Sequence, residues 1–143
     1  MPSNHLDLDN LEWRPGSAKY GDVAVHDGKE IIESAILSDR RPEGGGLALL
    51  SRVSPPPGKL VKIVAIARSD EHVFNLTGGR STKSGQPVRA ATDYTLNPEG
   101  QVHSVLIGTE NLSLVIYRGE SDQNISFEVI DATPNEAETS VVD

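Results

Sequence analysis

Few residues in this chain of 143 amino acids have side chains suited to acid–base or metal chemistry. Its four histidines stand at positions 5, 26, 72 and 103, and a titratable triplet, Asp70, Glu71 and His72, directly follows a long aliphatic run. An imidazole beside a carboxylate can transfer protons or bind a metal ion. The chain has no cysteine, which excludes disulfides, thiolate nucleophiles and cysteine metal sites. Carboxylates and imidazoles are therefore the groups from which a reactive site would be built.

The elements that must position these side chains are short and extended. About nine apolar runs, rich in Val and Ile, alternate with turns that contain Gly, Pro or Asn, which is the pattern of an all-β domain. No run keeps a helical period over three turns, and only a turn near "DLDNLEW" suggests a helix. The runs cover residues 22–27, 30–37, 46–54, 59–67, 72–76, 88–96, 101–107, 112–117 and 125–130.

The run "KLVKIVAIA", residues 59–67, is apolar on both of its faces. A strand that is half exposed to water would alternate more regularly between apolar and polar residues. We therefore expect one face of this strand to line a barrel and the other face to meet a second sheet or a second subunit. A small barrel or a double-sheet jelly roll satisfies this requirement.

Two short motifs place titratable residues in such a barrel. The segment "NPEGQVH" ends at His103, and its turn through Pro98 and Gly100 would start the next strand with this histidine facing inward. This turn resembles the second conserved motif of the cupin superfamily. The "PPG" turn at residues 56–58, and the spacing of six residues between Glu71 and Gly78, resemble parts of the first cupin motif.

The resemblance covers residues 45–119 and implies a cupin-type double-stranded β-helix, an RmlC-like jelly-roll barrel. We expect a single cupin-like domain at residues 1–131, which includes an N-terminal arm. Residues 132–143 are acidic and poor in large apolar side chains, so we expect a disordered tail there.

The first cupin motif also carries a His-x-His pair, which this chain lacks. The turn spacing puts Val64 and Ile66 at the two ligand positions, or two alanines in the neighbouring register. A catalytic metal needs about three protein ligands, and the resemblance leaves only Glu71 and His103. We therefore predict no metal and no other cofactor, although a ligand set rebuilt with His26 is an alternative.

Without a metal, Glu71 and His103 would form a proton-transfer pair in an apolar cavity. Burial would raise the pKa of the carboxylate and lower that of the imidazole, while their mutual attraction would oppose both shifts. The alternative is that both residues are relics of a metal-binding ancestor and now only bond to their neighbours. The expected apolar lining of the cavity is Val64, Ile66, Val73 and Val105.

Four further residues are candidates for contact with a ligand. Arg52 lies in an apolar strand and could hold a ligand carboxylate, or it is a surface charge at a strand edge. Lys62 interrupts an apolar face as a cavity base, or it extends its amine to water at the barrel mouth. Asn75 shares a strand face with Glu71. Tyr94 could direct its hydroxyl at a ligand, or pack in the core.

The net charge of −8 is concentrated after Arg118, the last basic residue of the chain. Seven acidic residues follow it, which leaves 14 acidic residues against 13 basic ones up to that point. No basic patch is indicated, so we expect no nucleic-acid partner. No apolar run approaches the roughly 20 residues of a membrane helix, and the acidic N-terminal stretch shows no targeting pattern. We expect a cytoplasmic homodimer with a small-molecule ligand and no membrane partner.

Three functions agree with these features. The first is a metal-independent enzyme that performs isomerisation, dehydration or cyclisation on a small, mostly apolar organic molecule. The second is a non-catalytic cupin that binds or senses a small molecule, or that has a structural role. The third is a metal-dependent dioxygenase with a rebuilt ligand set. We favour the first, because an unpaired polar group in a filled core costs roughly 1–3 kcal/mol, so two retained polar residues favour an open cavity.

Overall fold

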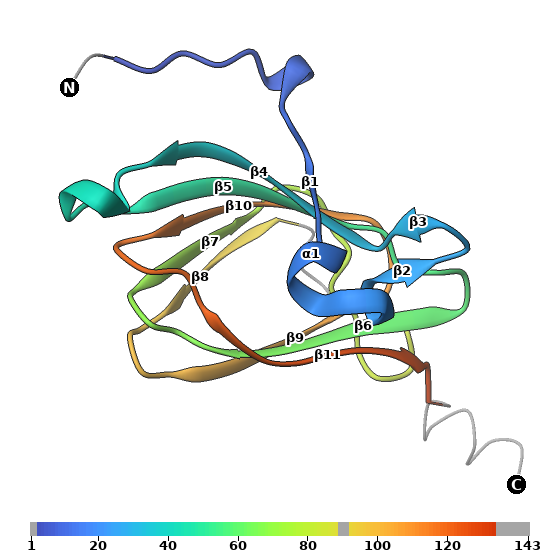
Figure 1. Cartoon of the computed structure of the whole chain (residues 1–143). Coiled ribbons are helices and arrows are strands. Elements are labelled where there is room, and N and C mark those ends of the chain that lie inside the picture. Colours follow the sequence, from blue (N-terminus) through green and yellow to red (C-terminus); the bar gives the residue numbers. More distant parts are fainter. Residues whose placement is uncertain (1–2, 89–91, 134–143) are drawn as a thin grey trace, which may run out of the picture.

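Two antiparallel β-sheets face each other in the structure, a computed structural model in which residues 3–88 and 92–133 are described (Figure 1). In chain order the elements are η1 (Leu8–Asn10), β1 (Arg14–Pro15), α1 (Ser17–Tyr20), η2 (Gly21–Ala24), β2 (Val25–His26), β3 (Lys29–Glu30), β4 (Ile32–Asp39), η3 (Arg41–Glu43), β5 (Leu47–Val53), β6 (Lys59–Ile66), β7 (Glu71–Asn75), β8 (Asp93–Asn97), β9 (Val102–Ile107), β10 (Asn111–Tyr117) and β11 (Gln123–Asp131). The larger sheet has the order β1-β4-β5-β10-β7-β8, and the smaller has the order β11-β6-β9. The predicted all-β jelly-roll architecture is confirmed.

The apolar runs of the sequence correspond to the strands from residue 30 onward, and the prediction fails mainly near the N-terminus. The run at 22–27 forms the 3₁₀ turn η2 and the short strand β2 rather than one longer strand. The turn expected near "DLDNLEW" is the 3₁₀ helix η1, whose start is capped by the side chain of Asp7. The short helix α1 was not predicted. Most of the predicted tail, residues 134–143, lies outside the described residues, as do residues 89–91.

Both turns that carry the sequence motifs depend on a glycine with positive φ. Gly58 (φ 74°) ends the turn before β6, and Gly100 (φ 86°) lies in the turn before β9. Only glycine adopts these angles without a steric penalty. In the second turn, the Gln101 amide donates to the Pro98 carbonyl at 3.0 Å. Each turn therefore fixes the point at which its strand begins, and hence the parity of the side chains that follow.

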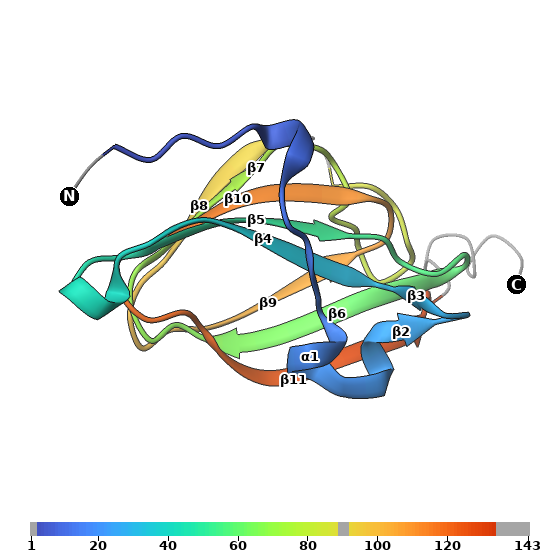
Figure 2. The same ribbon diagram turned by 45° about the horizontal axis from the view of Figure 1, so that its top comes forward.

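The segment that contains β1 and α1 crosses from the larger sheet toward the smaller one (Figure 2). The Gly16 amide donates to the Ile32 carbonyl at 2.8 Å. A Cβ atom on Gly16 would lie 2.3 Å from the Ile32 side chain, so the close approach requires a glycine here. Farther on, the Tyr20 ring stacks on Phe127 of β11 with 4.6 Å between the ring centroids. Residues 14–20 thus pack against both sheets.

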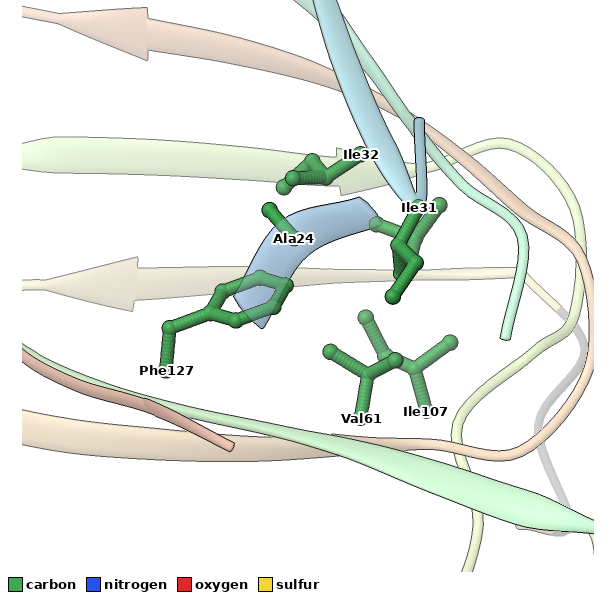
Figure 3. Close-up of a cluster of buried hydrophobic side chains, with 7 residues drawn as sticks. Ala24, Ile31, Ile32, Val61, Ile107 and Phe127 are labelled. Atoms are coloured by element: carbon green, nitrogen blue, oxygen red, sulfur yellow. The ribbon is translucent and has the colours of Figure 1, made fainter. Parts of the chain in front are cut away.

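The main apolar cluster lies at the end of the barrel where β5 and β9 finish and β4 begins. Figure 3 shows Ala24 and Ile31 packed with side chains from both sheets, among them Val61 and Phe127. The members of the cluster are Ala24, Ile31, Ile32, Val53, Val61, Ile107 and Phe127. This cluster joins the two sheets at one end and leaves the other end to the titratable residues. None of the helices in the described parts of the chain has the length and apolar character needed to cross a bilayer.

The Phe127 ring is predicted to make a large contribution to stability. Phe127 is 8% exposed and contacts both the apolar cluster and Tyr20, so Phe127→Ala should lower the free energy of unfolding by roughly 3–5 kcal/mol. The matched control is Ile125→Ala on the same strand, where Ile125 is 54% exposed and the loss should stay below about 1 kcal/mol. Urea unfolding measures both values, and similar losses for the two variants would contradict this packing.

Candidate functional site

A cavity of about 640 Å³ lies between the two sheets. Its central wall is apolar and consists of Leu49, Ile63, Val73, Val105 and Val115. A volume of this size falls within the range of pockets that hold small organic molecules. The β1–α1 segment also contributes to the wall, through residues 14–16 and 18–20.

Three titratable side chains meet at the end of the cavity opposite the main apolar cluster. Glu71 is the first residue of β7, His103 is the second residue of β9, and Asp122 directly precedes β11. His103 Nε2 lies 2.7 Å from Asp122 Oδ2 and 3.4 Å from Glu71 Oε1. The side chains of Glu71 and Asp122 are 6% and 8% exposed, and that of His103 is 22% exposed. The imidazole is therefore the most accessible of the three groups.

Strand register brings the partners of Glu71 into place. Glu71 is paired with Asn97 of β8 and with Tyr117 of β10, and residues paired across antiparallel strands point to the same face. The Asn97 amide donates to Glu71 Oε1 at 2.8 Å, and Tyr117 also forms a side-chain hydrogen bond with Glu71. The carboxylate of Glu71 is thus held in a fixed position at the inner surface of the larger sheet.

The loop between β10 and β11 holds Asp122 opposite His103. The Ser69 hydroxyl donates to the Glu120 carbonyl at 2.7 Å and accepts from the Gly119 amide at 3.0 Å. Arg68 Nε donates to the Ser121 carbonyl at 2.7 Å. These bonds fix the loop to the segment before β7, so Asp122 Oδ2 faces the imidazole. Asp122 Oδ1 is buried and has no hydrogen-bond partner among the described residues.

The environment raises the pKa of both Glu71 and His103. For Glu71 the main cause is burial, followed by the negative charge of Asp122. For His103 the main cause is the hydrogen bond to Asp122, which outweighs the opposite effect of burial. From the sequence, burial was expected to raise the pKa of Glu71 and to lower that of His103, with their attraction opposing both shifts. Asp122, whose hydrogen bond raises the pKa of His103, was not identified. Burial also raises the pKa of Tyr117 and raises that of Tyr20 to about 12, so both phenols keep their protons.

Comparison with solved structures identifies the architecture. A Ralstonia eutropha JMP134 protein of unknown function with a cupin-like fold matches with a TM-score of 0.58 and 15% identity, over 89% of this chain and 79% of that one. The polyketide cyclase RemF from Streptomyces resistomycificus matches with a TM-score of 0.58 and 14% identity, over 94% and 89% of the two chains. Streptomyces PAC13, in a structure with uridine, matches with a TM-score of 0.53 and 14% identity, over 96% and 98%. This chain has the cupin fold. No family model matches the sequence, and the search of curated proteins finds no match.

The cupin barrel uses the other of the two registers considered for β6. Ala65 is paired with His103 and Ile63 with Val105, so the even-numbered residues of β6 point away from the cavity. Ile63 and Ala65 line the cavity, whereas Val64 and Ile66 do not. The prediction of Val64 and Ile66 as cavity residues is therefore wrong by one residue, although the wall that replaces them is also apolar.

Some of the other residues predicted to contact a ligand line the cavity, and others do not. Val73 and Val105 line the cavity, but Lys62 shares the outward parity of Val64 and does not. Arg52 is an outer-surface residue that lies over the Trp13 ring and pairs with Glu33 at 3.1 Å. These two basic residues were therefore wrongly placed in the cavity.

Tyr94 and Asn75 also differ from the prediction. Tyr94 is 51% exposed, and its hydroxyl lies 2.7 Å from His72 Nδ1 on the outer face of the sheet. Asn75 does share the inner face with Glu71 and is 2% exposed, but it does not line the cavity and instead accepts a hydrogen bond from Asn111. Tyr94 therefore lies on the outer face of the sheet, away from the cavity, and Asn75 lies in the packed interior.

Three site residues were not selected from the sequence. Asn97 directly precedes the Pro98 turn and ends the strand beside Glu71, so the motif did contain a signal for it. Tyr117 lies in an apolar run, where core packing is the more common role of a tyrosine. Asp122 was counted only as part of the acidic C-terminal region, because a loop residue carries no periodicity that would indicate where it points.

Asp122 also corrects the count of possible metal ligands. In the described residues, Glu71, His103 and Asp122 form a group whose ligand atoms all lie within 4.8 Å of one another. However, two ligands held about 2.1 Å from one tetrahedral ion lie about 3.4 Å apart, and His103 Nε2 lies only 2.7 Å from Asp122 Oδ2. Glu71 in addition accepts hydrogen bonds from Asn97 and Tyr117. In this arrangement the three residues form a hydrogen-bonded cluster, and we expect it to hold a proton rather than an ion.

Elemental analysis of the protein purified without chelator should therefore give a substoichiometric content of every transition metal. The apolar surface at Ala65, where a His-x-His cupin motif would offer an imidazole, provides no further ligand. One equivalent of a transition metal that is retained on dialysis, and is lost in the Asp122→Asn variant, would contradict this interpretation.

The titration of His103 should depend on Asp122. In the wild-type protein we expect the His103 pKa above the usual value of 6.5, and Asp122→Asn should lower it because the charged hydrogen-bond partner is removed. Two-dimensional NMR of the imidazole nitrogens measures both values. Asp131→Asn is the matched control, because the Asp131 side chain is 80% exposed and remote from the imidazole in the strand register. An unchanged His103 pKa in Asp122→Asn would contradict the proposed pairing.

The raised pKa of His103 also makes the stability of the protein depend on pH. The folded protein binds the His103 proton more tightly than the unfolded chain, so the contribution to stability is complete below about pH 6.5 and is lost as the pH rises through the folded pKa. The raised pKa of Glu71 has the same sign, with a window that begins near its usual value of 4.5. The free energy of unfolding should consequently fall between mildly acidic and mildly alkaline pH, and fall less in Asp122→Asn.

Proposed function

We propose that this cupin-fold protein is a metal-independent enzyme that performs acid–base chemistry on a small, mostly apolar organic molecule. The observation that carries the proposal is the position of His103, a partly accessible imidazole between two buried carboxylates at one end of an apolar cavity. Isomerisation, dehydration and cyclisation are the reactions that such a group of side chains suits, because each needs a proton removed from one atom and delivered to another.

The roles of the side chains follow from their partners. Glu71 has a raised pKa, which makes its carboxylate a stronger base, and it is held by Asn97 and Tyr117, so we assign it the removal of a proton from carbon. The hydrogen bond to Asp122 raises the pKa of His103 and so favours its protonated form, which can stabilise negative charge that develops on a substrate oxygen and then return a proton. Asp122 does not need to touch the substrate. It acts as a positioning residue that sets the orientation and charge of the imidazole.

The open cavity supports this function over a structural role. A barrel filled with side chains would have no room for a ligand, whereas this one contains a volume of about 640 Å³. The occurrence of the same fold in a polyketide cyclase, and in a protein studied with uridine, agrees with an organic small molecule as the ligand. A binding or sensing protein remains the alternative, and catalytic turnover distinguishes it from an enzyme.

We also propose that the protein acts as a cytoplasmic homodimer. The outer face of the larger sheet exposes large apolar side chains that are neighbours in the strand register, namely Phe74, Tyr94, Leu96 and Ile116. A second copy of the chain could cover this surface. The mass of a single chain in sedimentation equilibrium at working concentration would contradict the dimer.

Proton abstraction can be tested before the natural substrate is known. In D₂O, the chelator-treated protein should catalyse exchange of the α-protons of small phenyl-substituted alkyl ketones such as 4-phenylbutan-2-one, as followed by ¹H NMR. Glu71→Gln and His103→Gln should each lower the exchange rate by about 10²–10⁴-fold, because each removes a group that carries a proton.

His72→Gln is the matched control for this experiment. His72 is the neighbour of Glu71 in sequence but lies against Tyr94 on the outer face, so this change should leave the exchange rate as in the wild type. Exchange at the background rate in the wild-type protein, or equal rates in the wild type and in Glu71→Gln, would refute the enzymatic function.

A further inference from the structure

A second polar region crosses the cavity wall at the opposite end from His103. Ser34 of β4 is paired with Ser51 of β5, and Ser51 is paired with Ser113 of β10. Directly opposed residues of antiparallel strands point to the same face, and all three serines line the cavity. We call these three residues the serine rung. On the inner face of β4 and β5 it is the next pair after Ile32 and Val53 of the apolar cluster, so it lies toward that end of the cavity.

The serine rung has hydrogen-bonding capacity that the protein does not use. Among the described residues, no hydrogen bond is formed by the hydroxyls of Ser34 and Ser51, whereas the Ser113 hydroxyl donates to Asn111 at 3.1 Å. Elsewhere in the cavity wall, Ser81 is 8% exposed, and its buried hydroxyl also has no partner among the described residues. Hydroxyls beside apolar walls are unfavourable unless water or a ligand bonds to them. The presence of serines rather than alanines at these positions therefore indicates that a polar group of a ligand bonds to their hydroxyls.

The chemistry of this end is polar, and the line of paired residues carries its charged groups at its two ends. At one end Arg14, an exposed residue of β1, is paired with Ser34 and lines the cavity. The line of paired residues continues from the serines to Asn75 and then to Asp93, and Asp93 forms an ion pair with Arg80 at 2.8 Å. This pair cancels the charge of Arg80, which also lines the cavity. A neutral group with hydroxyls, which can donate and accept, matches the serines better than a carboxylate or a phosphate does.

The distance to the acid–base cluster sets the length of such a ligand. A strand rises by about 3.3 Å per residue, so the four steps from Glu71 to Asn75 along β7 span about 13 Å. Between the two polar regions lies one apolar rung, in which Leu49, Val115 and Val73 are paired. The cavity therefore presents an alternation of polar, apolar and titratable surfaces along its axis.

We propose that the serine rung binds the neutral, hydroxyl-bearing end of an elongated substrate whose reacting carbon lies at Glu71 and His103. The middle of this substrate is apolar and packs on Leu49, Val73 and Val115. The inference rests on the proposed function in one respect, which is that the cavity is the place where the substrate binds. The proposed substrate is bifunctional, with an enolisable carbonyl group at one end and a hydroxyl group at the other.

Three synthetic probes test this assignment by isothermal titration calorimetry. They are 4-(4-hydroxyphenyl)butan-2-one, its counterpart without the hydroxyl, 4-phenylbutan-2-one, and the carboxylate analogue 4-(3-oxobutyl)benzoate. We expect the hydroxyl probe to bind about tenfold more tightly than the probe without it, as one buried hydrogen bond allows. Ser51→Ala and Ser34→Ala should each reduce this preference, while Ser126→Ala should not, because Ser126 lies opposite Val64 and outside the cavity lining.

The outcomes separate this inference from the acid–base function. Equal binding of the first two probes, tightest binding of the carboxylate, a preference that survives both serine variants, or no binding of any probe would each overturn the serine rung as a subsite. In the exchange assay, Ser51→Ala should raise the KM of the hydroxyl probe and leave kcat and the His103 pKa unchanged. If the hydroxyl probe binds more tightly but Glu71→Gln does not change the exchange rate, the subsite is retained and the enzymatic function is rejected. If exchange depends on Glu71 but the hydroxyl gives no preference in binding, the enzymatic function is retained and the subsite is rejected.

Discussion

The burial of two carboxylates beside one imidazole is the constraint on which the active end of this barrel depends. Glu71 and Asp122 are both shielded from water, and two such charges repel each other unless a proton or a cation lies between them. His103 supplies that positive charge, and Asn97 and Tyr117 supply hydrogen bonds to Glu71. The raised pKa values of Glu71 and His103 are two consequences of this arrangement. A proton shared by these groups is what acid–base chemistry requires.

Local sequence signals predicted the fold well because they are themselves physical devices. The turns at Gly58 and Gly100 need the backbone freedom of glycine, and the β-branched runs between turns are suited to strands that pack on two sides. The short N-terminal elements were less predictable. Helix α1 has four residues and no periodic apolar face, and it is held in place by the stacking of Tyr20 on Phe127, a contact between residues more than one hundred positions apart.

The candidate site was predicted in part, and its errors have two physical origins. His103 and Glu71 were found because each occurs at a fixed distance from a turn. Val64 and Ile66 were misplaced because side chains alternate along a strand, so an error of one residue moves every side chain to the other face. Asp122 was missed for a different reason. It belongs to a loop whose path is set by Ser69 and Arg68, and no local pattern in the sequence records such tertiary bonds.

Residues 14–20 form a wall of the cavity without being part of either sheet's central strands. They are anchored at the Gly16 amide and at the Tyr20 ring, and the side chains between these anchors are not fixed by strand pairing. Natural selection can therefore alter this segment and reshape the cavity while Glu71, His103 and Asp122 stay fixed. Divergence of specificity in descendants of this protein would be concentrated in that short stretch, where the barrel is most tolerant of new side chains.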